Sequence, residues 1–133
     1  SYVSANFFEW SYLNGKNINS YPLKEILFDL KKFSLNHNTQ LFIRSIPFEG
    51  KLLNILCKKK QVWGVSTPYI NFKDRFHGAG DLSTALYADN ILRKNNLKKT
   101  LENVTKEIFI HLIKFKNKRG KRILFKAKNL SNL

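Results

Sequence analysis

The residues with the clearest chemical potential form one short stretch, a glycine-rich turn that ends in a carboxylate. Gly78, Ala79 and Gly80 precede Asp81, and an amphipathic helical pattern begins at once. Backbone N–H groups at a helix start are unpaired and carry partial positive charge, so such a turn lets an anion approach closely. A carboxylate repels phosphate, so Asp81 suits another task. It could take the proton from an alcohol that attacks a γ-phosphate, while the turn steadies the transferring phosphoryl group.

The same turn has a plain structural interpretation. Asp is a favoured N-cap, and a Gly-x-Gly-Asp sequence taken alone is more often a helix cap than a catalytic site. The stretch is not a Walker A loop, which needs Gly-Lys-Ser/Thr. It is not G-x-G-x-x-G either, because Ser83 stands where the third glycine belongs. The elements around the turn must therefore decide between the two interpretations.

Strand and helix patterns alternate along the chain, which indicates an α/β layer structure with a mostly parallel sheet. We expect strands at 2–5 and 40–44, a hairpin within 51–70 that Pro68 ends, and a last strand at 122–125. We expect a short helix at 7–13 and longer helices from Leu23, from Asp81 and over 97–115. Ser20 is the predicted cap of the second helix, with Pro22 in its first turn.

Composition limits the class of protein. The 133 residues suffice for one modest domain, and the formal net charge of +15 brings nucleic acid into consideration as a partner. The charge is spread along the chain, however, and no segment alternates Arg with aromatics as a stacking platform does. Cys57 is the only cysteine, and neither a signal-peptide pattern nor a membrane-spanning apolar run is visible, so we expect a cytoplasmic protein.

The order of these features resembles the C-terminal portion of the ribokinase-like superfamily, and within it pyridoxal kinase. The stretch "HGAGDLSTALYADNILRKNNLKKTLENVTKEIF" resembles the superfamily's catalytic signature. Ahead of it stand "ANFFE", similar to a strand ending in Asn-x-x-Glu, then "LFIRS", a hairpin and "VSTPYINF". The resemblance implies a three-layer ribokinase-like fold, C-terminal part only. Residues 1–133 would be its nucleotide-binding and catalytic portion, with 116–133 as a basic tail.

The resemblance implies a role for each matching residue. Asp81 would be the general base for the 5′-hydroxymethyl group of pyridoxal, pyridoxine or pyridoxamine, and Gly78, Ala79 and Gly80 would form the anion hole. Asn6 and Glu9 would organise Mg²⁺ and the triphosphate of ATP, with Glu9 reaching the metal partly through water. Arg44 and Ser45 would contact nucleotide phosphates, and the segment from Val65 to Phe72 would border the adenine. A homodimer is the oligomeric state that the resemblance suggests.

Two departures from the family bear on activity. Ala5 stands where the family usually has Pro, and the family's N-terminal portion, which supplies the vitamin pocket and lid, has no counterpart here. The chain also contains no Met, so we expect a segment of a longer protein and no kinase activity from these residues alone. The alternatives are another ribokinase-like sugar or nucleoside kinase, a basic nucleic-acid-binding module and an inactive remnant. No Cys stands at the position of Asp81, which argues against the hydroxymethylpyrimidine kinase branch.

Overall fold

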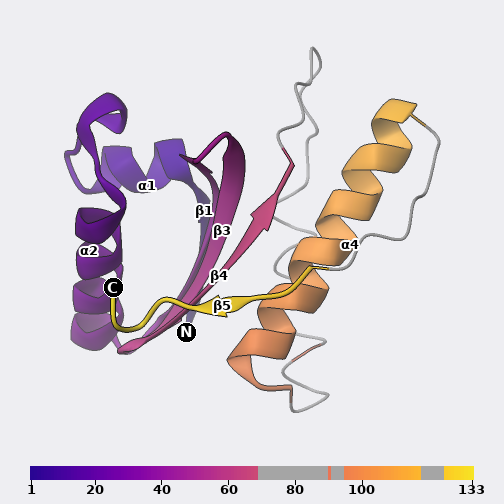
Figure 1. Cartoon of the computed structure of the whole chain (residues 1–133). Coiled ribbons are helices and arrows are strands. Elements are labelled where there is room, and N and C mark those ends of the chain that lie inside the picture. Colours follow the sequence, from indigo (N-terminus) through magenta and orange to yellow (C-terminus); the bar gives the residue numbers. More distant parts are fainter. Residues whose placement is uncertain (69–89, 91–94, 118–124) are drawn as a thin grey trace.

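The computed structural model describes residues 1–68, 90, 95–117 and 125–133, and the side chains of 111–117 are outside the description. Its elements, labelled as in Figure 1, follow the order β1 (Tyr2–Asn6), α1 (Phe7–Leu13), the 3-10 helix η1 (Ile18–Ser20), α2 (Leu23–His37), β2 (Gln40–Phe48), β3 (Lys51–Lys58), β4 (Gln61–Thr67), α4 (Leu97–Asn117) and β5 (Lys128–Asn129). The expected helix from Asp81 lies outside the described residues.

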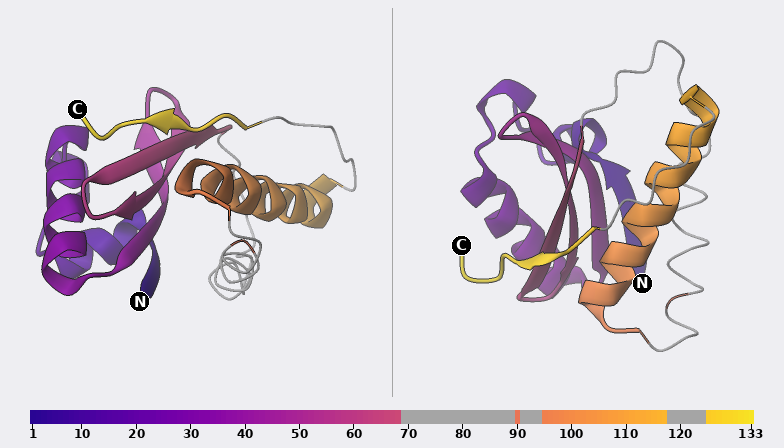
Figure 2. Two further views of the ribbon diagram at one scale, coloured as in Figure 1. Left: turned by 90° about the horizontal axis from the view of Figure 1, so that it is seen from below. Right: turned by 45° about the vertical axis from the view of Figure 1, so that its right-hand side comes forward.

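The strands form one sheet between two helical layers, which confirms the three-layer α/β class. Helices α1 and α2 cover one face of the sheet and α4 covers the other, as Figures 1 and 2 show. The core accordingly has two parts. Trp10, Leu27, Leu41 and Ile55 belong to the part under α1 and α2, and the part under α4 includes Leu101, whose side chain is fully buried. Successive residues of a strand point to opposite faces, so one sheet supplies both parts.

The sheet order is β1-β2-β3-β4-β5, and the sheet is mixed. Strands β1 and β2 are parallel, whereas the other three described pairs are antiparallel. The expectation of a mostly parallel sheet is therefore wrong for the described strands. The reason is local: two-residue links join β2 to β3 and β3 to β4, and links that short permit only antiparallel hairpins. Among the described elements, the connection through α1, η1 and α2 is the crossover between parallel strands.

Two predicted boundaries are also corrected. Pro22, not Ser20, is the N-cap of α2, and it makes no side-chain capping bond. Proline suits the position because its fixed φ and missing N–H fit the edge of a helix. The last strand is Lys128–Asn129, paired with Trp63 and Gly64, and Phe125 precedes it instead of lying within it. Within the described ranges, none of the helices has both the length and the apolar character needed to span a membrane.

Candidate functional site

Asn6 and Glu9 lie where β1 ends and α1 begins, and they form a capping box. The Asn6 side chain accepts a hydrogen bond from the backbone N–H of Glu9 at 2.7 Å. The Glu9 carboxylate accepts one from the backbone N–H of Asn6 at 2.9 Å. Each side chain thus satisfies a donor that a helix start leaves unpaired. The Asn-x-x-Glu spacing therefore has a structural cause, and it holds both oxygen-bearing side chains at the end of the strand.

Arg44 lies directly beside this pair because parallel strands end at the same edge of a sheet. The register of β1 against β2 pairs Asn6 with Arg44. Arg44 is partly buried, and burial lowers its pKa, while the charge of Glu9 opposes that shift. Its Nε has no hydrogen-bond partner among the described residues. A desolvated cation with an unpaired donor favours an anionic ligand, since such groups are costly to leave unpaired.

Ser45 follows in a break of the β2–β3 ladder. The register shifts between Ile43 and Ile46, and Ser45 has a left-handed backbone with φ of 66°. Its backbone N–H donates to the Oδ1 of Asn54 at 3.1 Å, and its side chain is exposed. The bulge turns Ser45 away from the regular ladder at the point where β2 passes the end of β1.

Asn54 is a site-supporting residue that the sequence analysis missed. It is buried in the middle of β3, and its Nδ2 donates to the carbonyl of Val65 on β4. One amide therefore joins the Ser45 bulge to two further strands. The available sequence signal was an Asn inside the apolar run "LLNILC", because a polar side chain buried in a strand needs partners of its own.

A buried polar chain fixes α1, and with it the capping box, against α2. The indole N–H of Trp10 donates to Tyr21 Oη at 3.2 Å, and that hydroxyl donates to Asp29 Oδ2 at 2.6 Å. Burial and the bond to Asp29 raise the pKa of Tyr21, so its hydroxyl stays protonated as a donor. Lys16 forms an ion pair with Glu25 at 2.5 Å and lies over the Tyr21 ring, which closes the loop between the helices.

Comparisons with known proteins find relatives at the level of structure only. No family model and no curated protein matches the sequence. A candidate phosphomethylpyrimidine kinase from Bacteroides thetaiotaomicron is similar over 97% of this chain, with a TM-score of 0.73 and 16% identity. Pyridoxal kinase from Entamoeba histolytica is similar over 97% of this chain, with a TM-score of 0.70 and 15% identity. Pyridoxal kinase from Bacillus subtilis, in its ADP complex, is similar over 98%, with a TM-score of 0.61 and 16% identity.

The chain has the ribokinase-like fold. It covers 51%, 50% and 50% of those three structures, so it spans about half the length of the proteins it matches. A second crystal form of the Bacteroides protein contains pyridoxal and is similar over 91% of this chain, with a TM-score of 0.70 and 20% identity. The likeness therefore extends to proteins assigned to two substrate classes, and it identifies the fold.

Within this ribokinase-like fold, the described residues bring together Asn6, Glu9, Arg44 and Ser45 at the shared edge of β1 and β2. The predicted base and anion hole, Asp81 with Gly78, Ala79 and Gly80, lie outside the described residues. Of the expected adenine border, Val65 to Thr67 complete β4, Pro68 follows the strand, and 69–72 lie outside the description. The four clustered residues thus remain candidates by position, and the turn remains a prediction from sequence.

The cluster has the right donors for a magnesium ion held mainly by water and phosphate. In the described part of the chain, no three His, Cys, Asp or Glu side chains gather as a metal cage. One carboxylate, Glu9, stands at the strand end, and its two oxygens can accept more bonds than the capping box uses. Mg²⁺ is usually bound through one or two carboxylates plus substrate phosphates. Among the residues that the structure describes, the donors therefore fit a magnesium ion bound through Glu9, water and phosphate, and they do not form a dedicated protein cage.

Proposed function

We propose that this chain is the nucleotide-binding and catalytic part of a ribokinase-like kinase that phosphorylates the 5′-hydroxyl of a vitamin B6 compound with ATP. The observation that carries the proposal is the cluster at the β1–β2 edge, where a carboxylate and a desolvated arginine with an unpaired Nε lie together in a kinase fold. A negatively charged triphosphate supplies the acceptors that Arg44 lacks.

In the proposed reaction, the substrate hydroxyl oxygen attacks the γ-phosphorus, and the bond from that phosphorus to the β–γ bridging oxygen breaks. The hydroxyl proton passes to Asp81, and ADP leaves. The N–H groups of Gly78, Ala79 and Gly80 stabilise the negative charge on the transferring group. Arg44 and Ser45 hold the nucleotide phosphates. Mg²⁺, when bound near Glu9, neutralises phosphate charge.

Pyridoxal, pyridoxine and pyridoxamine are the preferred substrate class on two grounds. The sequence around the glycine turn is similar to pyridoxal kinase, and two of the structural neighbours are pyridoxal kinases while a third was crystallised with pyridoxal. A phosphomethylpyrimidine-type substrate is the second candidate, since the Bacteroides neighbour is assigned to that class. We further propose that the complete protein is cytoplasmic and homodimeric, as the resemblance suggests.

The test uses the full-length natural protein that contains these residues. ATP-dependent phosphorylation is measured with pyridoxal, a hydroxymethylpyrimidine, ribose and a nucleoside as acceptors. We expect turnover with pyridoxal, and Asp81→Asn should lower kcat by about 10²–10⁴-fold with ATP affinity largely kept. Glu49→Gln is the matched control, because it removes an exposed carboxylate at the β2–β3 turn and should leave kcat unchanged.

Three results would contradict parts of the proposal in different ways. Turnover with another acceptor but not pyridoxal rejects the substrate class and keeps the kinase. Full activity in Asp81→Asn rejects the base. ATP binding that is absent from the folded wild-type protein rejects the kinase altogether and favours an inactive remnant or a nucleic-acid-binding module.

A further inference from the structure

A groove beside β4 is lined by apolar and basic residues to which the proposed kinase reaction assigns no catalytic role. It has a volume of about 380 Å³, within the range of small-molecule pockets, and it lies on the α2 face beside β4. Leu53, Gly64 and Ser66 form its floor, and Leu23 at the start of α2 forms one wall. None of Asn6, Glu9, Arg44 or Ser45 lines it, and Ser66 is the one lining residue that falls within the expected adenine border.

The groove exists because α2 covers only part of its sheet face. Helix α2 packs mainly on β3 and less on β2 and β4, and the segment 125–133 runs beside β4. Gly64 permits that close approach, since a Cβ at this position would lie 2.5 Å from Leu130 Cδ1. The segment then supplies the second wall through Leu130 and Leu133. Phe48, at the β2–β3 turn, adds an apolar end.

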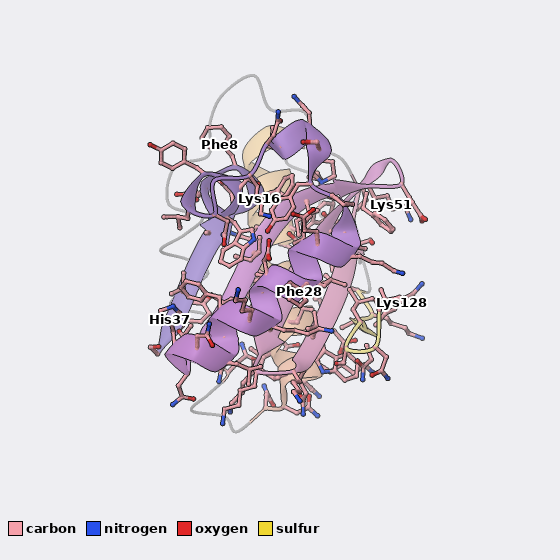
Figure 3. The ribbon with its side chains drawn as sticks, turned by 90° about the vertical axis from the view of Figure 1, so that its left-hand side faces the viewer. Phe8, Lys16, Phe28, His37, Lys51 and Lys128 are labelled. Atoms are coloured by element: carbon pink, nitrogen blue, oxygen red, sulfur yellow. The ribbon has the colours of Figure 1, made fainter. Side chains whose placement is uncertain are left out.

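The rim of the groove is cationic. Lys51, Lys126 and Lys128 line it from three positions, against one carboxylate, Glu49. Among the described residues, no ion pair engages any of these four side chains. Figure 3 shows Lys51 and Lys128 along the same side of α2. An apolar floor under a rim with two excess positive charges selects a ligand that has an apolar body and an anionic group.

We propose that this groove binds a small anionic amphiphile, an aromatic or short aliphatic group that carries a phosphate, sulfonate or carboxylate. The apolar body would lie on Leu53, Gly64 and Leu130, and the anion would face Lys51 and Lys128. Each part of the ligand should contribute separately, because burial of apolar area and attraction to exposed lysines are independent terms. The groove contains none of the four clustered residues and shares only Ser66 with the expected adenine border, so its occupancy is tested apart from the kinase proposal.

The probe is 8-anilinonaphthalene-1-sulfonate, an aromatic sulfonate whose fluorescence rises in apolar surroundings. It is titrated into the full-length natural protein in a buffer where the protein is folded, as its cooperative unfolding shows. Phenyl phosphate and octanoate should both displace the probe, whereas inorganic phosphate, which has no apolar body, and benzyl alcohol, which has no charge, should displace it at least tenfold less well. Better displacement by phenyl phosphate identifies an aromatic ligand, and better displacement by octanoate an aliphatic one.

Variants locate the binding. Ser66→Phe places a ring on the exposed floor of the groove and should weaken probe binding at least tenfold. Lys51→Gln with Lys128→Gln should weaken it by about two- to fivefold per charge and flatten its salt dependence. Lys60→Gln, exposed at the β3–β4 turn, is the control and should change nothing. Binding that survives Ser66→Phe unchanged, that ATP alone displaces, or that is absent from the folded protein overturns the proposal.

Discussion

At the scale of single residues, Glu9 and Asn6 serve a helix and, in our proposal, a nucleotide at once. Their capping box uses one oxygen of each side chain for a backbone N–H. The Asn-x-x-Glu spacing can therefore be explained by folding alone, so a test of the functional role needs a substitution that keeps the cap. Glutamine offers it, because Gln at this position closes a capping box as Glu does.

Glu9→Gln and Asn6→Ala should separate the two roles. Glu9→Gln keeps the reciprocal bond and removes the charge, so the unfolding free energy should change by less than about 0.5 kcal/mol while magnesium-dependent ATP affinity falls. Asn6→Ala loses the cap and should cost about 1 kcal/mol. Urea unfolding and ATP titration with and without Mg²⁺ measure both. Unchanged magnesium dependence in Glu9→Gln would leave Glu9 with its structural role only.

Cys57 should make the stability depend on pH only in the alkaline range. Burial raises the pKa of its thiol to about 12, from an ordinary value near 9. The unfolded chain loses this proton first, so the native state binds more protons above that ordinary value. The contribution is therefore complete below about pH 8.5 and is lost as pH rises towards 12. Comparing wild type with Cys57→Ala by urea unfolding from pH 7 to 10 isolates the effect, and equal slopes would refute it.

At the scale of elements, the segment 125–133 joins the two helical layers. The backbone N–H of Ala127 donates to Glu102 on α4, and the carbonyl of Ser131 accepts from Lys31 on α2. Between them, Leu130 donates its N–H to Val62 and lies over Gly64. Figure 1 shows this segment passing from the α4 side of the sheet to the α2 side. The sequence analysis assigned these residues to a basic tail. They contain strand β5 and connect the two helical layers, and we call the segment 125–133 the clasp.

Gly64→Val should release this clasp. A branched side chain at position 64 meets Leu130 and Leu53, where even a Cβ lies 2.5 and 3.1 Å from their Cδ1 atoms. We expect a loss of about 1–3 kcal/mol in unfolding free energy and faster hydrogen exchange at Leu130. Ser66→Val, exposed on the same strand and face, is the control and should be neutral. Retained protection at Leu130 in Gly64→Val would show that the crossing does not depend on the glycine.

The elements that sequence reasoning predicted well are those with a local cause. The periodic apolar positions of α2 and α4 and the short basic link of the β3–β4 hairpin each specify their own structure. The length of β2 was missed because Pro47 argues against a strand. Beyond the Asn6–Arg44 pair, however, β2 has no described neighbour on the β1 side, so a missing N–H there breaks no bond. Pairing with β3 therefore extends β2 to Phe48, which the local sequence around Pro47 does not indicate.

In the candidate site too, the parts with a local cause were predictable and the parts that depend on strand pairing were not. The capping box is a local motif, so its geometry follows from the spacing of Asn6 and Glu9. The resemblance assigned both Asn6 and Arg44 to the nucleotide phosphates, but their pairing depends on strand register, which periodicity does not specify. The support that Asn54 gives to the Ser45 bulge was not foreseen, because three strands must be paired before one amide can join them.

At the scale of the whole molecule, the net charge of +15 needs an account that the kinase fold does not provide. In a dedicated nucleic-acid surface, the phosphate contacts are concentrated, so affinity falls only when lysines of that surface are removed. In a diffuse positive field, removing a lysine anywhere lowers affinity by a similar factor. The chain allows a fair comparison, because exposed lysines lie both at the β3–β4 turn and beside the α2 groove. Equal charge removed at two distant places then distinguishes the two cases.

We predict that the charge acts as a diffuse field. Lys58→Gln with Lys60→Gln, and Lys51→Gln with Lys128→Gln, each lower the formal net charge from +15 to +13, because each pair removes two lysines. Binding of a single-stranded oligonucleotide should be weak at 0.15 M salt and should fall by the same factor in both doubles, with ATP affinity unchanged. Fluorescence anisotropy over a salt series measures this. If one pair lowers oligonucleotide affinity tenfold and the other leaves it intact, the surface contains a dedicated nucleic-acid site, and the nucleic-acid alternative gains the support that the fold alone denies it.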